Sequence, residues 1–276
     1  MDQSPNTEAS KNLRLVHLRK KILEVVYRAR ASHIGSSFSV AEILFAVFSS
    51  IDIDKVWCRS SDRDRVLLSK GHAAAALYVV LSEFGLMTEG DLGTYCTNGS
   101  LLGGHATHHV RYVEHSTGAL GHGLPVAVGV CIGMKTKKIG SRVFVIVGDS
   151  ELHEGSNWEA MMLAGHLNLD NLRLLVDYNT LGGIDCIDNC CSLEPLHRKL
   201  ESFGFSVFEI DGHDLDAIMT TFKDSQNSAT PVAIICHTVK GKGVSFMEGN
   251  NAWHYRPPSK DEYERALSEI TGASES

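Results

Sequence analysis

Two strand-like segments, each followed by oxygen-bearing side chains, constrain the fold of this chain more than any other feature. Residues 142–147 run into Gly148-Asp149-Ser150, and residues 172–176 run into Asp177-Tyr178-Asn179. The stretch between them, residues 154–166, has the pattern of a helix. A β-α-β unit of this kind predicts two parallel strands whose carboxyl ends open on the same edge of one sheet.

That edge is where open α/β sheets bind their ligands. The carboxylate of Asp149 and the amide oxygen of Asn179 would form an all-oxygen half-shell, which suits Mg²⁺ or Ca²⁺ better than Zn²⁺. Phosphate oxygens commonly complete such a shell. The two residues therefore predict a metal–diphosphate site.

The rest of the chain alternates between helical and strand patterns. Helices are expected at residues 13–31, 39 onward, 73–84, 123–132, 215–222 and from 259, and strands at 66–68, 207–210 and 232–236. We expect a loop at residues 32–37, followed by a capping box of Ser39 and Glu42. No repeat and no long linker interrupts this order. The pattern predicts a single doubly wound α/β domain over residues 13–276, with a mainly parallel sheet, helices on both faces, and a flexible lead-in at residues 1–12.

Composition excludes several classes of protein. The net charge of −7 gives no electrostatic footprint for nucleic acid. No run approaches the roughly 18 apolar residues that a membrane span needs, and residues 1–12 lack the apolar core of a signal peptide. The seven cysteines form no C-x-x-C pair, which favours reduced thiols in a cytoplasmic protein.

Other candidate ligand-binding residues occur at predicted strand ends and in loops. Lys70 and His72 follow the strand at 66–68, and both can bind diphosphate oxygens. The Gly-rich turn 118–123 leads into a helix and can hold a ligand against backbone amides. It is no dinucleotide fingerprint, because Pro125 and Val126 follow where a third glycine is required. Taken singly, each feature is also explained by a surface position or a helix start.

Three further histidines, His33, His105 and His254, lie in polar or Gly/Ser-rich segments. Histidine titrates near neutrality and can move protons or donate hydrogen bonds to developing oxyanions. A single loop histidine is more often a surface residue. The three support a functional site if their loops converge on the predicted ligand-binding edge.

The spacing of these motifs resembles a known fingerprint. Gly148-Asp149-Ser150, the 28 residues 151–178, and then Asn179 resemble the thiamine diphosphate motif, which is written G-D-G, a spacer, and N-N. The surrounding sequence resembles the transketolase family in seven segments that occur in family order over residues 13–258. These segments are 32–35, 62–72, 104–105, 117–123, 154–160, 211–214, and 240–243 through 253–254.

The resemblance implies roles for individual residues. Asp149, Asn179 and the backbone carbonyl of Leu181 would bind the divalent metal. The residues expected to hold the cofactor, mainly at its diphosphate, are Ser36, Lys70, His72, Gly118, Ala119, Leu120, Ser150, Asn179 and Lys240. The residues expected at the reacting groups are His33, His105 and His254, which would contact substrate hydroxyls and assist proton transfer. Glu154 is expected near a subunit interface, in a network that couples paired active sites.

Several positions depart from the family pattern. Ser150 and Tyr178 replace a glycine and an asparagine of the fingerprint, and His122 stands where glutamine is common. Gly182-Gly183-Ile184 replaces a stretch that normally places an apolar residue beneath the thiazolium, which leaves the role of Ile184 open. Tyr255 follows His254 where glycine is usual, which would alter the substrate mouth.

Length is the largest departure. A complete transketolase carries two further domains, which supply the glutamate that activates the cofactor ring and most ligands of the acceptor phosphate. The resemblance therefore implies the N-terminal subunit of a split transketolase, bound in a heterotetramer to a separately encoded C-terminal subunit with the pyrimidine-binding and C-terminal domains. With thiamine diphosphate and Mg²⁺ (or Ca²⁺), it would transfer a two-carbon ketol unit between sugars or sugar phosphates.

Alternative functions remain at this stage. The chain could serve a ketol-transfer enzyme specialised for an unusual sugar, or it could be a non-catalytic or regulatory subunit with the same fold. The complete set of predicted histidines and metal ligands argues against a regulatory role. In addition, a metal-dependent phosphohydrolase would need a carboxylate nucleophile or a cluster of metal-binding aspartates, and the sequence offers neither.

Overall fold

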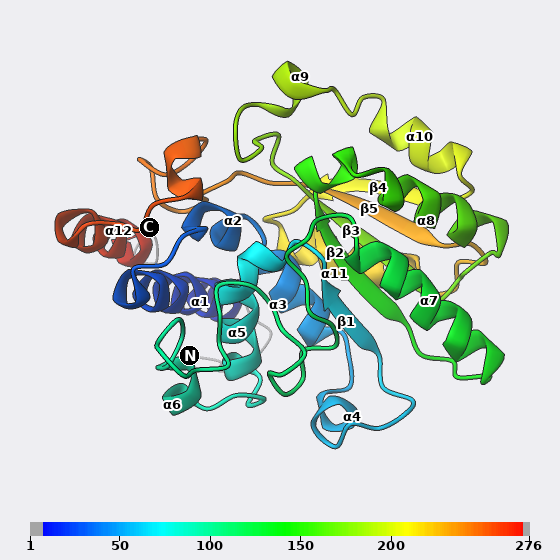
Figure 1. The fold of residues 1–276 in the computed structure, drawn as a ribbon, viewed down its shortest axis with the longest axis horizontal. Coiled ribbons are helices and arrows are strands. Elements are labelled where there is room, and N and C mark those ends of the chain that lie inside the picture. The colour runs from blue at the N-terminus through cyan, green and yellow to red at the C-terminus, as the bar shows by residue number, and fades with distance from the viewer. Residues whose placement is uncertain (1–7, 273–276) are drawn as a thin grey trace.

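The computed structural model describes residues 8–272, and its centre is a sheet of five parallel strands (Figure 1). The strands are β1 (Arg65–Leu68), β2 (Val143–Gly148), β3 (Leu172–Tyr178), β4 (Ser206–Asp211) and β5 (Val232–His237). Their order across the sheet is β1-β2-β3-β5-β4, and every neighbouring pair is parallel. Since β2 and β3 are neighbours, the predicted β-α-β unit and parallel sheet are confirmed.

The strands bury side chains on both faces of the sheet. In β2, Phe144 and Ile146 belong to one hydrophobic core, whereas Val145 and Val147 belong to the other. Successive side chains of a strand point to opposite faces, so a strand covered on both sides must be apolar throughout. This is why β2 is a continuous apolar run rather than an alternating one, while β3 is interrupted by the buried charged residues Arg173 and Asp177.

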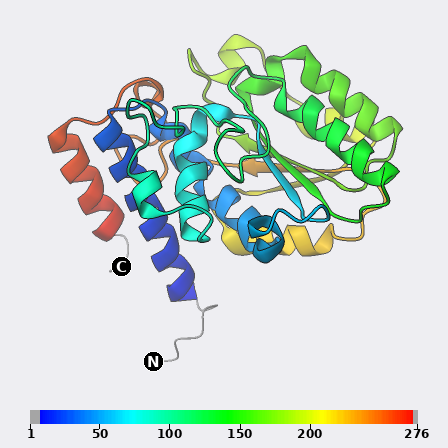
Figure 2. The same ribbon diagram turned by 60° about the horizontal axis from the view of Figure 1, so that its bottom comes forward.

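Helices cover the two faces and complete a doubly wound architecture (Figure 2). The first core is covered by α1 (Glu8–Ala29), α2 (Ile34–Ser39), α3 (Ala41–Ser49), α5 (Ala74–Glu83), α11 (Leu215–Asp224) and α12 (Lys260–Gly272). The second core is covered by α7 (Gly123–Thr136), α8 (Gly155–His166) and α10 (Leu196–Ser202). Shorter helices are α4 (Ile53–Trp57), α6 (Glu89–Leu92), α9 (Ile187–Cys190), η1 (Gly71–Ala73), η2 (Ser150–His153) and η3 (Asn251–His254).

Two details near the N-terminus differ from the sequence predictions. Helix α1 already begins at Glu8, while residues 1–7 of the predicted lead-in lie outside the described residues. The predicted loop at 32–37 is helical from Ile34 onward, as part of α2. More of the N-terminal region is therefore helical than the local sequence pattern indicates.

The predicted capping box of Ser39 and Glu42 is wrong. Ser39 ends α2, and its hydroxyl donates to the carboxylate of Asp177 at 2.6 Å instead of capping α3. Glu42 accepts a hydrogen bond from Arg19 and lies 3.1 Å from a ring nitrogen of His213. Long-range partners in the buried interior thus replace the local hydrogen bonds that the sequence suggests.

The described helices and the cysteines can be compared with the sequence predictions about membrane spans and thiols. None of the helices within residues 8–272 combines the length and hydrophobicity required to cross a bilayer. All seven cysteines are free thiols, and Cys131 and Cys236 are buried.

Candidate active site

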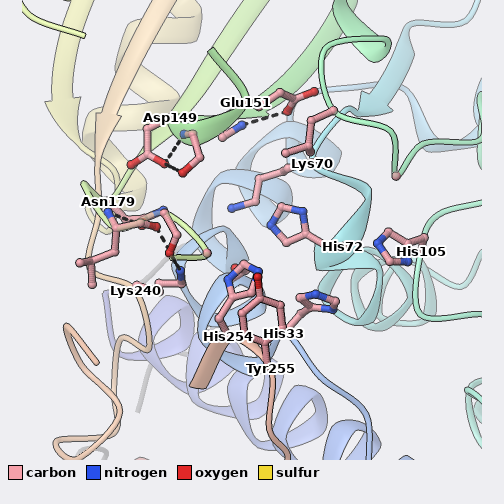
Figure 3. A pocket seen from close by; sticks show the side chains of 18 residues that line it. His33, Lys70, His72, His105, Asp149, Glu151, Asn179, Lys240, His254 and Tyr255 are labelled. Carbon is pink, nitrogen blue, oxygen red and sulfur yellow. Dashed lines mark hydrogen bonds between the residues drawn. The ribbon is translucent and has the colours of Figure 1, made fainter. Parts of the chain in front are cut away.

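A cavity of about 250 Å³ opens at the carboxyl edge of the sheet (Figure 3). Most of the predicted site residues line it, namely His33, Ser36, Lys70, His72, His105, Gly118, Leu120, Asp149, Ser150, Asn179, Leu181, Lys240 and His254. Gly148, Glu151, Gly182, Gly183 and Tyr255, to which the sequence assigned no binding role, line it as well. Ala119 and Glu154 are exposed and do not line it.

One end of the cavity, here called the oxygen end, consists of Asp149, Asn179 and the Leu181 carbonyl. Asp149 is 2% exposed, and its two carboxylate oxygens accept hydrogen bonds from the backbone nitrogens of Ser150 (2.7 Å) and Thr180 (2.6 Å). Burial, followed by the nearby charge of Asp177, raises the pKa of Asp149 to about 6. Within residues 8–272 no lysine or arginine forms an ion pair with Asp149. A divalent cation would supply the missing positive charge, so the residues fit a metal.

The remaining members of the oxygen end, Asn179 and the Leu181 carbonyl, are each held by a hydrogen bond. Asn179 accepts a hydrogen bond from the Leu181 nitrogen at 3.2 Å. The buried ammonium of Lys240 donates to the Leu181 carbonyl at 3.0 Å and to Gly182 at 2.9 Å. Burial and the neighbouring Lys70 charge lower the pKa of Lys240 to about 8. Because a carbonyl oxygen has two lone pairs, this hydrogen bond leaves the Leu181 oxygen able to accept a cation.

Between the two ends lies a buried ion pair that the sequence did not predict. Lys70 forms a salt bridge with Asp177, which also accepts hydrogen bonds from Ser39 and Thr238. Burial alone would raise the pKa of Asp177, but the Lys70 charge and these hydrogen bonds hold it below its usual value. Lys70 therefore reaches the cavity while already paired, and its contact with a diphosphate stays a prediction.

The opposite end, here called the histidine end, brings together four rings from distant segments. The ring centroid of His33 lies 5.1 Å from that of His254, 5.3 Å from that of His72 and 5.6 Å from that of His105. His33 adopts a left-handed backbone conformation (φ 71°), and its nitrogen donates to the His254 carbonyl at 2.9 Å. The predicted convergence of the histidine loops is thus present (Figure 3).

Three of the four rings at the histidine end, those of His33, His72 and His254, have lowered pKa values. Burial, followed by neighbouring positive charges, lowers the pKa of His33 to about 4 and that of His254 to about 3, and holds the pKa of His72 well below its usual value. At neutral pH these rings can both accept and donate hydrogen bonds. The Nδ1 atom of His254 is buried without a hydrogen-bond partner among the described residues, which fits a polar ligand in the cavity.

Close packing holds the Gly-rich turn against the cavity. A Cβ atom at Gly118, where φ is +146°, would lie 3.1 Å from the ring of His105. The Gly121 nitrogen donates to Glu151 at 3.1 Å, and the same carboxylate accepts hydrogen bonds from Gly148 (3.2 Å) and from Ser69. Glu151 therefore joins three segments of the cavity wall. The only sequence feature that could have indicated this role of Glu151 is its position directly after the Gly-Asp-Ser motif.

Two residues with open roles lie outside the cavity. Glu154 is the exposed N-cap residue of α8, so its expected place at a subunit interface stays a prediction. Ile184 is 90% exposed and does not line the cavity. Leu181 is the apolar side chain of this loop that lies at the wall.

Comparison with known proteins identifies the family. Residues 10–273 match the family described as the thiamine diphosphate binding domain of transketolase. The chain belongs to the transketolase family. The resemblance found in the sequence is thereby confirmed, and the cavity lies in a thiamine diphosphate-binding domain.

Similar proteins agree with this assignment. The chain is 39% identical over 257 residues to one subunit of the apulose-4-phosphate transketolase of Phocaeicola vulgatus, covering 92% of this chain and 91% of that protein. It is 34% identical over 256 residues to the 6-deoxy-6-sulfo-D-fructose transketolase subunit SqwG of a Clostridium species, covering 92% and 93% of the two chains. The solved transketolase of Campylobacter jejuni matches with a TM-score of 0.83 at 28% identity, over 95% of this chain and 42% of that one. The chain thus spans about two fifths of that transketolase but nearly all of the two subunits.

Proposed function

We propose that this chain is the N-terminal subunit of a split transketolase, which transfers a two-carbon ketol unit from a ketose donor to an aldose acceptor. The observation that carries this proposal is the cavity itself. In a member of the transketolase family, an oxygen end suited to a metal and an end of converging histidines share one space at the carboxyl edge of the sheet.

The oxygen end would hold the diphosphate through a metal. Asp149, Asn179 and the Leu181 carbonyl would bind Mg²⁺ (or Ca²⁺), because all three offer hard oxygen ligands. The residues that would hold the cofactor beside them are Ser36, Lys70, His72, Gly118, Ala119, Leu120, Ser150, Asn179 and Lys240. When bound, thiamine diphosphate supplies the carbon nucleophile and stabilises the carbanion that ketol transfer requires.

The histidine end would act on the sugar. His33, His105 and His254 would donate hydrogen bonds to substrate hydroxyls and accept or return protons during transfer. The lowered pKa values of His33 and His254 keep these rings neutral at physiological pH, as a proton acceptor must be.

A partner chain would complete the site. The two relatives described above carry the word subunit in their names and match this chain over nearly their full length, which supports a separately encoded C-terminal subunit. We expect that subunit to contribute the pyrimidine-binding and C-terminal domains within a heterotetramer, with the exposed Glu154 at the interface. Residues 13–276 would act as one domain. The free thiols support a cytoplasmic location.

A narrower form of this proposal names the class of substrate. The relatives are named for apulose 4-phosphate and 6-deoxy-6-sulfo-D-fructose, which are unusual sugars. A ketol-transfer enzyme for an unusual anionic sugar is therefore the favoured variant, and a screen of donors and acceptors would identify that sugar.

Reconstitution tests the proposal. The chain alone and the chain co-expressed with a C-terminal transketolase subunit would be assayed for ketol transfer with thiamine diphosphate and Mg²⁺. We expect transfer only from the complex, and only with cofactor. Full activity from the isolated chain would contradict the split architecture, whereas a complex that binds cofactor without transferring any unit would favour a regulatory role.

A further inference from the structure

A tyrosine stands at the mouth of the cavity, next to the histidine end. The Tyr255 ring lies 4.5 Å from that of His254 and 6.5 Å from that of His33, measured between ring centroids. Its side chain lines the cavity, yet Tyr255 is 63% exposed. A residue that both lines a cavity and faces solvent lies at the opening, so the Tyr255 ring lies at the mouth of the cavity, beside His254 and His33 (Figure 3).

The side chain also reaches the opposite lip of the cavity. A Cβ atom placed on Gly183 would lie only 2.8 Å from the Tyr255 hydroxyl and 3.4 Å from Nε2 of His254. The tyrosine therefore extends from the end of η3 to the glycine loop that follows Leu181. Gly183 leaves room for the hydroxyl, since a Cβ atom at this position would require the end of the tyrosine side chain to shift.

Backbone contacts hold this tyrosine in place. The Ser32 hydroxyl donates to the Tyr255 carbonyl at 2.7 Å, and the nitrogen of His33 donates to the His254 carbonyl at 2.9 Å. Residues 254–255 are thus tied to residues 32–33, which carry another histidine of the site. The backbone that carries the Tyr255 ring is therefore fixed by hydrogen bonds.

We propose that Tyr255 determines substrate length, by narrowing the mouth so that the cavity favours short acceptor aldoses over long ones. This inference rests on the proposed ketol transfer. An acceptor whose aldehyde reaches the histidines must extend its remaining carbons past the mouth. Each added carbon with its hydroxyl then meets the phenol ring, whereas a two-carbon acceptor ends before it. Steric exclusion of this kind is a property of ring bulk, so the hydroxyl is not required.

The test uses the complex of this chain with its C-terminal subunit. Hydroxypyruvate serves as a fixed donor, because it carries the two-carbon unit and releases carbon dioxide when that unit is taken up. Glycolaldehyde, glyceraldehyde, erythrose and ribose serve as acceptors of increasing length. We expect Tyr255→Gly to raise the ratio of kcat/KM for ribose over glycolaldehyde about tenfold, within the range that pocket sterics can supply. Tyr255→Phe should keep the wild-type ratio, and Tyr255→Trp should lower it.

A matched control and a binding measurement separate the outcomes. Trp57 is an aromatic residue of similar exposure (58%) that does not line the cavity, so Trp57→Gly should leave the ratio unchanged. Calorimetric affinity for thiamine diphosphate with Mg²⁺ should be the same in wild type and Tyr255→Gly. A ratio that stays within about twofold in both the glycine and tryptophan variants would overturn the length-selecting role. A wild-type complex that transfers to no acceptor would instead overturn the ketol-transfer function, and this inference with it.

Discussion

The two ends of the cavity are built in different ways. The oxygen end takes Asp149 and Asn179 from the carboxyl ends of β2 and β3, which are paired neighbours in the sheet. The histidine end takes its rings from the N-cap position of α2, from η1 and η3, and from the loop around His105, segments that lie far apart in the sequence. Strand register positions Asp149 and Asn179 at the oxygen end. The rings of the histidine end are brought together by the packing of helices and loops.

The two ends also differ in charge. Asp149 is a buried carboxylate whose raised pKa reflects burial and a nearby aspartate, so a cation stabilises its ionised form. His33 and His254 have lowered pKa values and are neutral at physiological pH. The first end is suited to a metal and a diphosphate, and the second to uncharged hydroxyl groups. Variants at each end should therefore fail in different assays.

The largest expected effect is at the oxygen end. Asp149→Ala removes the only predicted ligand that carries a negative charge, so metal-dependent binding of thiamine diphosphate should fall below detection in calorimetry of the assembled complex. Asp224→Ala, at the exposed end of α11, is the matched control and should bind normally. Unchanged cofactor affinity in Asp149→Ala would defeat the metal assignment.

The next effect is on the ion pair between the ends. Lys70→Met leaves Asp177 buried without its cation, which should cost about 3–5 kcal/mol of unfolding free energy in urea denaturation. Lys135 forms an exposed salt bridge with Asp170, and Lys135→Met should cost no more than about 1 kcal/mol. Equal losses of unfolding free energy in the two variants would mean that the buried pair of Lys70 and Asp177 stabilises the fold no more than an exposed pair does.

A smaller effect, on turnover, is expected at the histidine end. His254→Gln should lower kcat about 100-fold through loss of proton transfer, while the calorimetric affinity for thiamine diphosphate changes less than about threefold. His166→Gln, on the exposed end of α8, is the control for both assays. If His254→Gln lost cofactor binding in parallel with kcat, the division between the two ends would be wrong.

The last expected effect is a pH dependence of stability. Because the folded-state pKa of His254 is about 3, below its unfolded value, the unfolded chain takes up more protons as the pH falls below about 6.5. Wild type should therefore lose unfolding free energy relative to His254→Gln as the pH falls from about 6.5 to about 4, with a constant difference above about pH 7.5. Urea denaturation of both proteins across this range measures it. A difference independent of pH would show that His254 titrates normally.

The features that the sequence predicted correctly are those set by local pattern, and the features that it missed depend on contacts between distant segments. Apolar runs and strand-end motifs predicted all five strands and the position of Asp149 and Asn179 at one edge of the sheet, because these depend on local pattern and sheet register. Helix α2 was missed, since its Gly/Ser-rich sequence is a poor helix former and its burial comes from tertiary packing. Ser39 was misassigned because its partner, Asp177, is distant in sequence.

The contributions of single side chains to the cavity were harder to predict. Glu151 joins three segments through hydrogen bonds that no spacing rule describes. Convergence of the histidines was expected only conditionally, and required the fold to bring four segments to one edge. The resemblance to transketolase located most wall residues, but the structure leaves Ala119 outside the wall.

The oxygen end, and not the histidine end, should hold the metal. Crystals of the complex grown with thiamine diphosphate and Mn²⁺ in place of Mg²⁺ would be measured for anomalous scattering. We expect one strong peak between the side chains of Asp149 and Asn179, against the Leu181 carbonyl. A peak among the histidines, or none at the oxygen end, would contradict this expectation.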